Sequence, residues 1–566
     1  MEDTVHTSRP EDGRAPSWGT QRPSGMPVAK YRPYEPLGLA DRTWPDRRAT
    51  GAPLWASVDL RDGNQALIEP MDVRRKRRMF DLLVGMGFKE IEVGYPTASR
   101  DDYDFVRHLI EDDAIPDDVV IQVMAPIREH FIERTVECLR GARRAVLQVF
   151  NPTSEVQRRL VLRTDRRQTL ELALDGARQA LGLQDSLPGT ELYLQYAPES
   201  YTQTEPEYAL DICNTVLEHW APRAAHTLRI NLPATVEVFP PAEFADRIEY
   251  MSRNLAHRDR VLLSVHPHND RGSGVAAAEL AVLAGAQRVE GTLFGNGERT
   301  GNVCLVTLAM NLFSQGIDPM LDLRELDAVR RVVEDCNHLP VPARHPWAGD
   351  FVYTSFAGTH QDAIAKGLRN RHHDDDVWDV PYLPVDPRDI GRDYQALIRI
   401  NTQSGKGGIN HLLRTSYGLD LPRRLQIDFA ATMQLLCENL GGEVTAAQLW
   451  QAFQERYVDP GAAGPPDDAA PAAPAEGPED EDAWQAYAEL LPGGPGGQGE
   501  IRALHTATVG GPARGYVVYV EFAVLNRPFW GVGLHADRAV ALRRAKRAAV
   551  ARAVQLAGAG VPSMPV

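Results

Sequence analysis

The chain has 566 residues and a formal net charge of −16, with 77 acidic and 61 basic side chains. This length exceeds what one hydrophobic core organises, so we expect two to four domains. The acidic balance disfavours nucleic acid as a partner. No apolar run is long enough to cross a bilayer, no secretory segment opens the chain, and the five cysteines include no CxxC pair. These features predict a cytoplasmic multidomain protein without membrane attachment or a disulfide framework.

Residues 1–45 mix Pro, Arg, Gly and Asp without periodicity, which predicts a flexible arm, partly ordered where it docks. Between residues 46 and 330, short β-rich runs alternate with amphipathic stretches such as 73–86, 131–139 and 274–284. Eight such units fit a closed parallel barrel, although an open doubly wound sheet uses the same alternation. The expected strands are 54–60, 89–95, 119–125, 145–150, 191–197, 226–231, 261–266 and 288–294.

A biased segment separates this region from the C-terminus. Residues 459–483 contain only Ala, Gly, Pro, Asp and Glu, with eight acids and no base. Such a composition cannot bury enough apolar surface to offset the entropy of ordering, so we expect a disordered linker over 459–499. Beyond it, we expect strands at 502–509, 515–525 and 529–534 and a helix at 536–557.

Unusual polar residues follow several of the expected strands, where barrel enzymes place their sites. Arg61 and Asp62 follow the first strand and can present a cation and a metal-ligating carboxylate, or form a solvated turn with a surface ion pair. His266 and His268 end the seventh strand. Alternation along a strand points both imidazoles the same way, toward a shared metal ion. The alternative is two histidines that are hydrogen-bonded at a strand end.

Three further strand ends carry polar groups. Glu199 follows the fifth strand and is a candidate general base. Thr235 follows the sixth and can direct a hydroxyl at an anion. A glycine-rich loop over 295–302 follows the eighth, where Asn302 offers a carbonyl oxygen and the backbone can approach a ligand closely. A capped turn between strand and helix explains that loop equally well.

Long motifs in the same order carry a resemblance: SVDLRDGNQ, VGYP, PES, NLPATVE, HPHND, LFGNGERTGN, HPWAGDFVYTSFAGTHQDAIAKG and SGKGG. The chain resembles the 2-isopropylmalate synthases of the longer, actinobacterial form, closely over about residues 30–458. These belong to a superfamily of metal-dependent barrels that condense or cleave acyl-CoA. The resemblance implies condensation of acetyl-CoA with 3-methyl-2-oxobutanoate, followed by thioester hydrolysis, in leucine biosynthesis.

The resemblance also implies roles for single residues. One divalent cation (Mg²⁺, Zn²⁺ or Mn²⁺) is implied as cofactor, and an intertwined homodimer is implied because residues after the barrel reach the partner's site. The implied metal ligands are Asp62, His266, His268 and Asn302; the implied catalytic residues are Arg61, Glu199, His360 and Tyr394; and the implied binding residue for the 2-oxo acid is Thr235.

The sequence departs from this family at three places. Gln148 stands where the family has His, and Ala197 where it has Ser, both beside the 2-oxo acid. Neutral drift explains both changes, and so does a related enzyme that uses another 2-oxo acid. The family's leucine-binding domain has two sheet-and-helix halves, and here residues 500–566 resemble only the second.

We therefore predict a (β/α)8 TIM barrel over 46–330, small α/β linker subdomains over 331–458 that complete the active site in the dimer, and a reduced α+β regulatory module. The predicted function is 2-isopropylmalate synthesis. The alternatives are a synthase for another 2-oxo acid and, from a different class, an inert sensor that binds metabolites.

Overall fold

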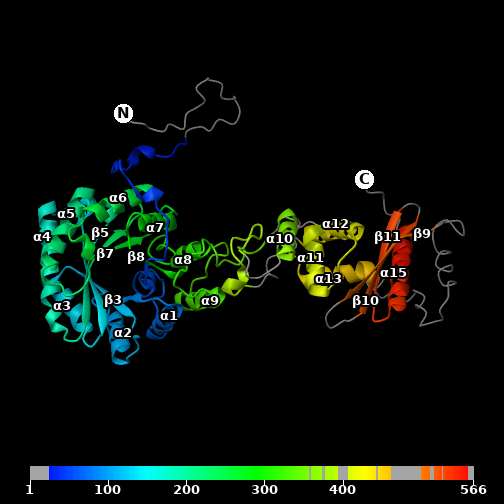
Figure 1. Cartoon of the computed structure of the whole chain (residues 1–566), viewed down its shortest axis with the longest axis horizontal. Coiled ribbons are helices and arrows are strands. Elements are labelled where there is room, and N and C mark those ends of the chain that lie inside the picture. The colour runs from blue at the N-terminus through cyan, green and yellow to red at the C-terminus, as the bar shows by residue number, and fades with distance from the viewer. Residues whose placement is uncertain are drawn as a thin grey trace, which may run out of the picture.

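The computed structural model describes residues 24–355, 358–371, 377–392, 406–440, 444–460, 499–509, 515–524 and 527–558. Within these ranges the chain forms a barrel, then a helical segment, then a small sheet with one helix (Figure 1). None of the described helices is both long and apolar enough to span a bilayer.

Eight parallel strands close into a barrel in chain order, with β1 paired to both β2 and β8. The predicted (β/α)8 fold is confirmed, and the open sheet is excluded. All eight strands fall where the sequence predicted them. They are β1 (Leu54–Ser57), β2 (Glu90–Gly94), β3 (Val120–Pro126), β4 (Arg144–Pro152), β5 (Glu191–Glu199), β6 (Leu228–Ala234), β7 (Val261–Pro267) and β8 (Arg288–Gly291).

A helix follows each strand and covers the outside of the barrel (Figure 1). Each turns an apolar stripe to the strands; in α1 the side chains of Phe80 and Leu83 are fully buried. Asp72 fixes the start of α1 because its carboxylate accepts the Arg75 N–H. The helices are α1 (Val73–Met86), α2 (Arg100–Glu111), α3 (Glu129–Cys138), α4 (Arg166–Gly182), α5 (Pro206–Trp220), α6 (Pro241–Asn254), α7 (Gly274–Leu283) and α8 (Leu305–Phe313).

The interior of the barrel holds paired charges where branched apolar side chains usually pack. Arg288 is fully buried and donates from Nε to Glu90 Oε2 and from Nη1 to Glu290 Oε1, each at 2.6 Å. Arg229 donates to the same Glu90 at 2.7 Å. A buried charge is tolerated only when it is paired and hydrogen-bonded. The network therefore supplies a charged but neutralised layer in the barrel interior.

The described end of the N-terminal arm lies along α6. Trp44 is buried and donates from Nε1 to Asp246 at 2.7 Å, while the Thr43 N–H donates to Glu249 at 3.0 Å. The Leu37 N–H donates to Glu243, also on α6, at 3.0 Å. Docking on three carboxylates of one helix orders this part of the arm; residues 1–23 lie outside the described ranges.

Helices follow the barrel, and an antiparallel sheet with strand order β11-β10-β9 and one helix after it end the described chain. The predicted C-terminal strands and helix are present, whereas nearly all of the predicted 459–499 linker lies outside the described residues. The helices are α9 (Leu326–Asn337), α10 (Gly358–Asn370), α11 (Lys406–Tyr417), α12 (Arg423–Leu440) and α13 (Ala446–Phe453); the sheet and its helix are β9 (Gly499–Val509), β10 (Gly515–Val524), β11 (Arg527–His535) and α15 (Arg538–Gly558).

The C-terminal sheet is covered on both faces. Val518 points to α15, whereas Val517 and Trp530 belong to a core that they share with Phe429 of α12 and Tyr457 after α13. The module at 500–566 is thus joined to the preceding helices by packed side chains as well as by the chain itself. We refer to this packing below as the shared core.

Candidate metal centre and active site

Three side chains meet at the mouth of the barrel: Asp62, His266 and His268. Asp62 lies in the turn after β1 (Asp59–Gly63), and the histidines lie at and just after the end of β7. Asp62 Oδ2 is 3.2 Å from His266 Nε2 and 3.1 Å from His268 Nε2. All three are buried, and one candidate ligand atom from each lies within 4.8 Å of the others. One carboxylate and two imidazoles at these distances form a set that can hold one metal ion.

The other ring nitrogen of each histidine has its own acceptor. His266 Nδ1 donates to Glu290 Oε2 at 2.8 Å, and His268 Nδ1 donates to the Ala234 carbonyl at 3.2 Å. Such bonds fix the tautomer and leave Nε2 of both rings directed at the metal position. Burial lowers the pKa of His266, but the bonds to Asp62 and Glu290 outweigh it and raise the pKa to about 9. A metal must therefore displace a proton from this ring.

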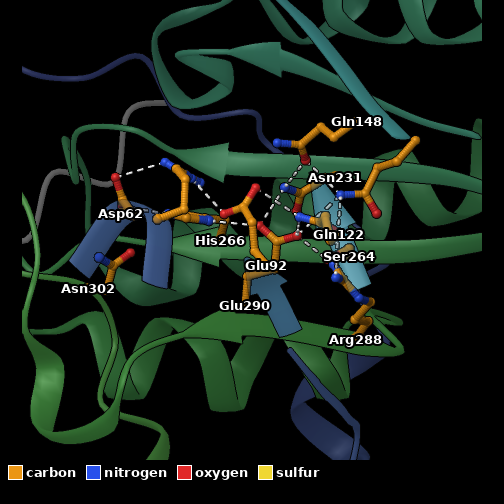
Figure 2. Close-up of polar contacts among 12 residues, drawn as sticks. Asp62, Glu92, Gln122, Gln148, Asn231, Ser264, His266, Arg288, Glu290 and Asn302 are labelled. Atoms are coloured by element: carbon orange, nitrogen blue, oxygen red, sulfur yellow. Dashed lines mark hydrogen bonds and ion pairs between the residues drawn. The ribbon is translucent and has the colours of Figure 1, made fainter. Parts of the chain in front are cut away.

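Asn302 supplies a fourth candidate ligand. Its side chain is 2% exposed, and Nδ2 donates to the Asn296 carbonyl at 3.2 Å. No described group donates to its Oδ1, although a buried carbonyl oxygen normally has a partner. Gly301 has a φ of +96°, and a Cβ there would lie 1.8 Å from the Gly295 carbonyl. The loop therefore requires glycine, and its fold leaves an oxygen free for a cation beside His268. Figure 2 shows Asn302 on the Asp62 side of the site.

Arg61 lies between two carboxylates next to this cluster. It donates from Nη1 to Asp62 at 2.9 Å and from Nε to Glu92 at 2.6 Å. Burial disfavours the charge, but Glu92 and Asp62 outweigh this and raise the pKa of Arg61 above its usual range. Burial also raises the pKa of Asp62, but Arg61 and the two histidines hold it well below its usual range. Both groups are therefore ionised at neutral pH.

Gln148 and Ala197 lie on β4 and β5, across the closed barrel from the strands of the candidate metal ligands. Gln148 Oε1 accepts from Gln195 Nε2 at 2.6 Å and from Asn231 Nδ2 at 3.1 Å. Figure 2 shows this oxygen turned toward Asn231 and the Gln148 nitrogen turned away from it. Ala197 is 3% exposed. The wall opposite the metal position thus has a fixed amide and a methyl group.

Glu199 and Thr235 lie at the ends of β5 and β6. The Glu199 side chain is half-buried, and burial raises its pKa, opposed by a hydrogen bond from Gln157. Thr235 Oγ1 accepts the Ser200 N–H at 2.9 Å, which leaves the hydroxyl proton free to be donated. A carboxylate with a raised pKa in a barrel mouth suits proton transfer.

The structure does not bring His360 into this cluster within one chain. His360 lies in α10, is exposed, and stacks on Tyr382 with ring centroids 4.1 Å apart. Figure 1 places α10 beyond α8 and α9, away from the barrel strands. Tyr394 lies outside the described residues.

The residues beneath the site were not predicted from the sequence. Glu290 accepts from five groups: Arg288, Gln122, Gln195, Asn231 and His266. A signal existed, because Arg288 and Glu290 occupy alternate positions of a short strand, as Glu90 and Glu92 do in β2. Charged residues at i and i+2 of a buried strand point to one face and need partners there.

Comparisons with known proteins agree with this geometry. The HMGL-like family model matches residues 52–333, and the model described as alpha-isopropylmalate synthase, post-catalytic domain-like, matches residues 350–414. The barrel and its mouth therefore define an HMGL-like enzyme, a class that depends on a divalent metal.

Curated relatives narrow the class. The chain is 59% identical over 439 residues to the 2-isopropylmalate synthase of Parafrankia sp., covering 77% of this chain and 78% of that protein. It is 49% identical over 598 aligned positions to the 2-isopropylmalate synthase of Leifsonia xyli subsp. xyli, covering 96% of this chain and 99% of that protein. The chain belongs to the 2-isopropylmalate synthase family, whose members are acyltransferases, and the predicted function class is confirmed.

Proposed function

We propose that this chain condenses acetyl-CoA with 3-methyl-2-oxobutanoate and hydrolyses the thioester, giving 2-isopropylmalate and CoA for leucine biosynthesis in the cytoplasm. The observation that carries the proposal is the buried set of Asp62, His266 and His268, with the free Asn302 oxygen and Arg61 beside it. Asp62, His266, His268 and Asn302 would hold one divalent cation, Mg²⁺, Mn²⁺ or Zn²⁺. When bound, the cation polarises the carbonyl of the 2-oxo acid.

The remaining steps fall to side chains of the chain itself. Arg61 is a fixed cation next to the metal position and stabilises the alkoxide oxygen as its charge develops, without reorganisation. Thr235 donates its hydroxyl to the carboxylate of the 2-oxo acid. Glu199 removes a methyl proton from the thioester, which its raised pKa favours.

Thioester hydrolysis needs an activated water, and His360 and Tyr394 are proposed for this step from a partner subunit. The exposed position of His360 in α10, away from the barrel of its own chain, supports an intertwined homodimer. An imidazole accepts a proton from water near neutral pH, which suits this role.

A thiol-release assay with acetyl-CoA and a panel of 2-oxo acids tests the proposal. The expected result is metal-dependent CoA release that is fastest with 3-methyl-2-oxobutanoate. CoA release with another 2-oxo acid only would support the related synthase, and the absence of release with every 2-oxo acid and metal would support the inert sensor.

The orientation of Gln148 favours the related synthase as a second candidate. Asn231 Nδ2 also donates to the Glu290 carboxylate, which only accepts, so Gln148 must turn its oxygen to Asn231. Its nitrogen has no acceptor among the described residues and can only donate. A neutral, fixed donor opposite the metal position suits a 2-oxo acid whose side chain carries an acceptor.

Restoring the family's residues tests this second candidate. If Gln148 and Ala197 are adaptive, Gln148→His with Ala197→Ser shifts selectivity toward 3-methyl-2-oxobutanoate by up to roughly a hundredfold, the value of one or two hydrogen bonds. Competition between 2-oxo acids, read as a ratio of kcat/KM, measures the shift. A parent enzyme that already prefers 3-methyl-2-oxobutanoate to pyruvate and 2-oxobutanoate contradicts the second candidate.

We expect weak or absent inhibition by leucine. The described C-terminal part contains one sheet-and-helix unit, and feedback needs a complete pocket coupled to the barrel. We also expect deletion of residues 459–566 to leave turnover nearly intact while lowering solubility, because Phe429 and Tyr457 lose their cover in the shared core. A leucine titration of steady-state turnover is the measurement. Half-inhibition at micromolar leucine, lost on deletion, would contradict the expectation.

A further inference from the structure

The turn after β4, residues 153–157, holds the end of β5 through backbone and side-chain bonds. Thr153 donates its N–H and its hydroxyl to the Glu199 carbonyl oxygen, each at 3.1 Å. Gln157 donates from Nε2 to Glu199 Oε1 at 3.3 Å. Ser154 is buried and donates its hydroxyl to Gln157 Oε1 at 2.8 Å. Because Ser154 occupies the accepting end of the amide, the donating end of Gln157 faces the carboxylate.

The hydrogen bond from Gln157 is the main polar contact of the Glu199 carboxylate among the described residues. Among the described residues, Gln157 is the one group that donates to its carboxylate, and no described cation pairs with it. Burial raises the pKa of Glu199, and the Gln157 bond opposes that rise. The titratable group of another element that feels the Glu199 charge is Tyr95 after β2. Burial and Glu199 raise the pKa of this phenol, and Arg128 and Arg61 lower it.

We propose that Gln157, oriented by Ser154, is a positioning residue that holds the Glu199 carboxylate in place for the proton it removes from the thioester. The inference rests on the proposed function, in which Glu199 is the base. In that step the methyl C–H bond breaks and the proton moves to the carboxylate. The electron pair forms the bond to the 2-oxo carbon, and the π pair of that C=O bond moves to its oxygen, which becomes the alkoxide. The Glu199 carboxylate accepts the proton only while ionised, so activity falls as the pH drops through its pKa.

Two substitutions of Gln157 that should move the acidic limb of the kcat/KM profile in opposite directions test its role. Gln157→Met removes the donor at similar volume, and we expect kcat to fall by about tenfold to a hundredfold, the loss of one hydrogen bond to a charged group. The acidic limb of the kcat/KM profile moves up by about one pH unit. Gln157→Lys supplies a cation, so its acidic limb moves down. Ser154→Ala moves the limb in the same direction as Gln157→Met, by less.

The matched control is Glu155→Gln in the same turn. Glu155 is exposed and pairs with Arg159 at 2.7 Å. We therefore expect Glu155→Gln to have the same kcat/KM profile against pH as the parent enzyme. Metal affinity, measured by calorimetry with Mn²⁺, stays unchanged in all four variants because none contacts the metal cluster. Equal loss of kcat in Gln157→Met and Gln157→Lys with an unmoved acidic limb overturns the proposal, because a packing defect produces that result.

A second measurement separates this inference from the proposed function. The difference infrared spectrum between the parent and Glu199→Gln reports protonation of the Glu199 carboxyl without turnover. We expect its titration midpoint to rise in Gln157→Met. If the parent releases no CoA with any 2-oxo acid, the proposed function fails while this midpoint is still measured. A midpoint identical in parent and Gln157→Met overturns the role of Gln157.

Discussion

We expect His268→Ala to abolish measurable CoA release. The imidazole is one of three buried side chains that meet at one point, and its Nδ1 bond to Ala234 holds Nε2 toward that point. Without it, three of the four proposed ligands remain, Asp62, His266 and Asn302, and the affinity for the divalent cation falls. Because polarisation of the carbonyl by a metal is worth several kcal/mol, we expect turnover to drop by roughly a thousandfold or more.

The measurement is CoA release after exhaustive chelation and re-addition of Mg²⁺, Mn²⁺ or Zn²⁺, with calorimetric titration of each ion. His108→Ala is the control, because His108 is exposed on α2 and its loss leaves the metal cluster intact. Full activity of chelated His268→Ala would show that the cluster holds no catalytic metal.

The second large effect concerns stability. Arg288→Met leaves the carboxylates of Glu90 and Glu290 short of a partner in the barrel interior. Removal of one member of a buried charged network costs about 3–5 kcal/mol, because the remaining charges stay buried without compensation. For a domain of this size the thermal transition of the barrel then falls by roughly 5–10 °C. Metal affinity falls with it, because Glu290 holds His266.

Differential scanning calorimetry measures this shift. The matched control is Arg324→Met, whose guanidinium donates to Asp322 at 2.7 Å but is 82% exposed. An exposed pair of this kind contributes less than about 1 kcal/mol, so its transition stays within roughly 2 °C of the parent. Equal shifts in the two variants would show that the interior charges are not held as a network.

The sequence was sufficient to predict the strands and the convergence of Asp62, His266 and His268 at one barrel mouth. Each strand is a short β-rich run, and Asp62, His266 and His268 lie at or just after the carboxyl ends of two of them, which a closed parallel barrel gathers at one mouth. The sequence could not predict which partners the buried charges take. Arg288 and Glu90 are 198 positions apart, and their contact depends on the stagger between strands once the barrel closes.

Part of the site could also be predicted from the sequence, and part of it could not. Asn302 was identified by its loop and by the family resemblance, and its free oxygen is a property of the folded loop. Gln157 had no sequence signal, because it stands among arginines in a segment without periodicity. Its role depends on Ser154 and Glu199, which the fold brings to it from the same turn and from β5.

The shared core has a consequence for how the chain is made. Phe429 and Tyr457 leave the ribosome before Trp530, which covers them in the finished protein. At roughly 5–20 residues per second, the apolar faces of these two residues stay uncovered for about 4–20 s until Trp530 is synthesised. During this interval the nascent chain presents the kind of surface that chaperones bind and that drives aggregation. Messages truncated between the codons for Tyr457 and Trp530 should therefore yield a product of lower solubility, even where the barrel that precedes them has already folded.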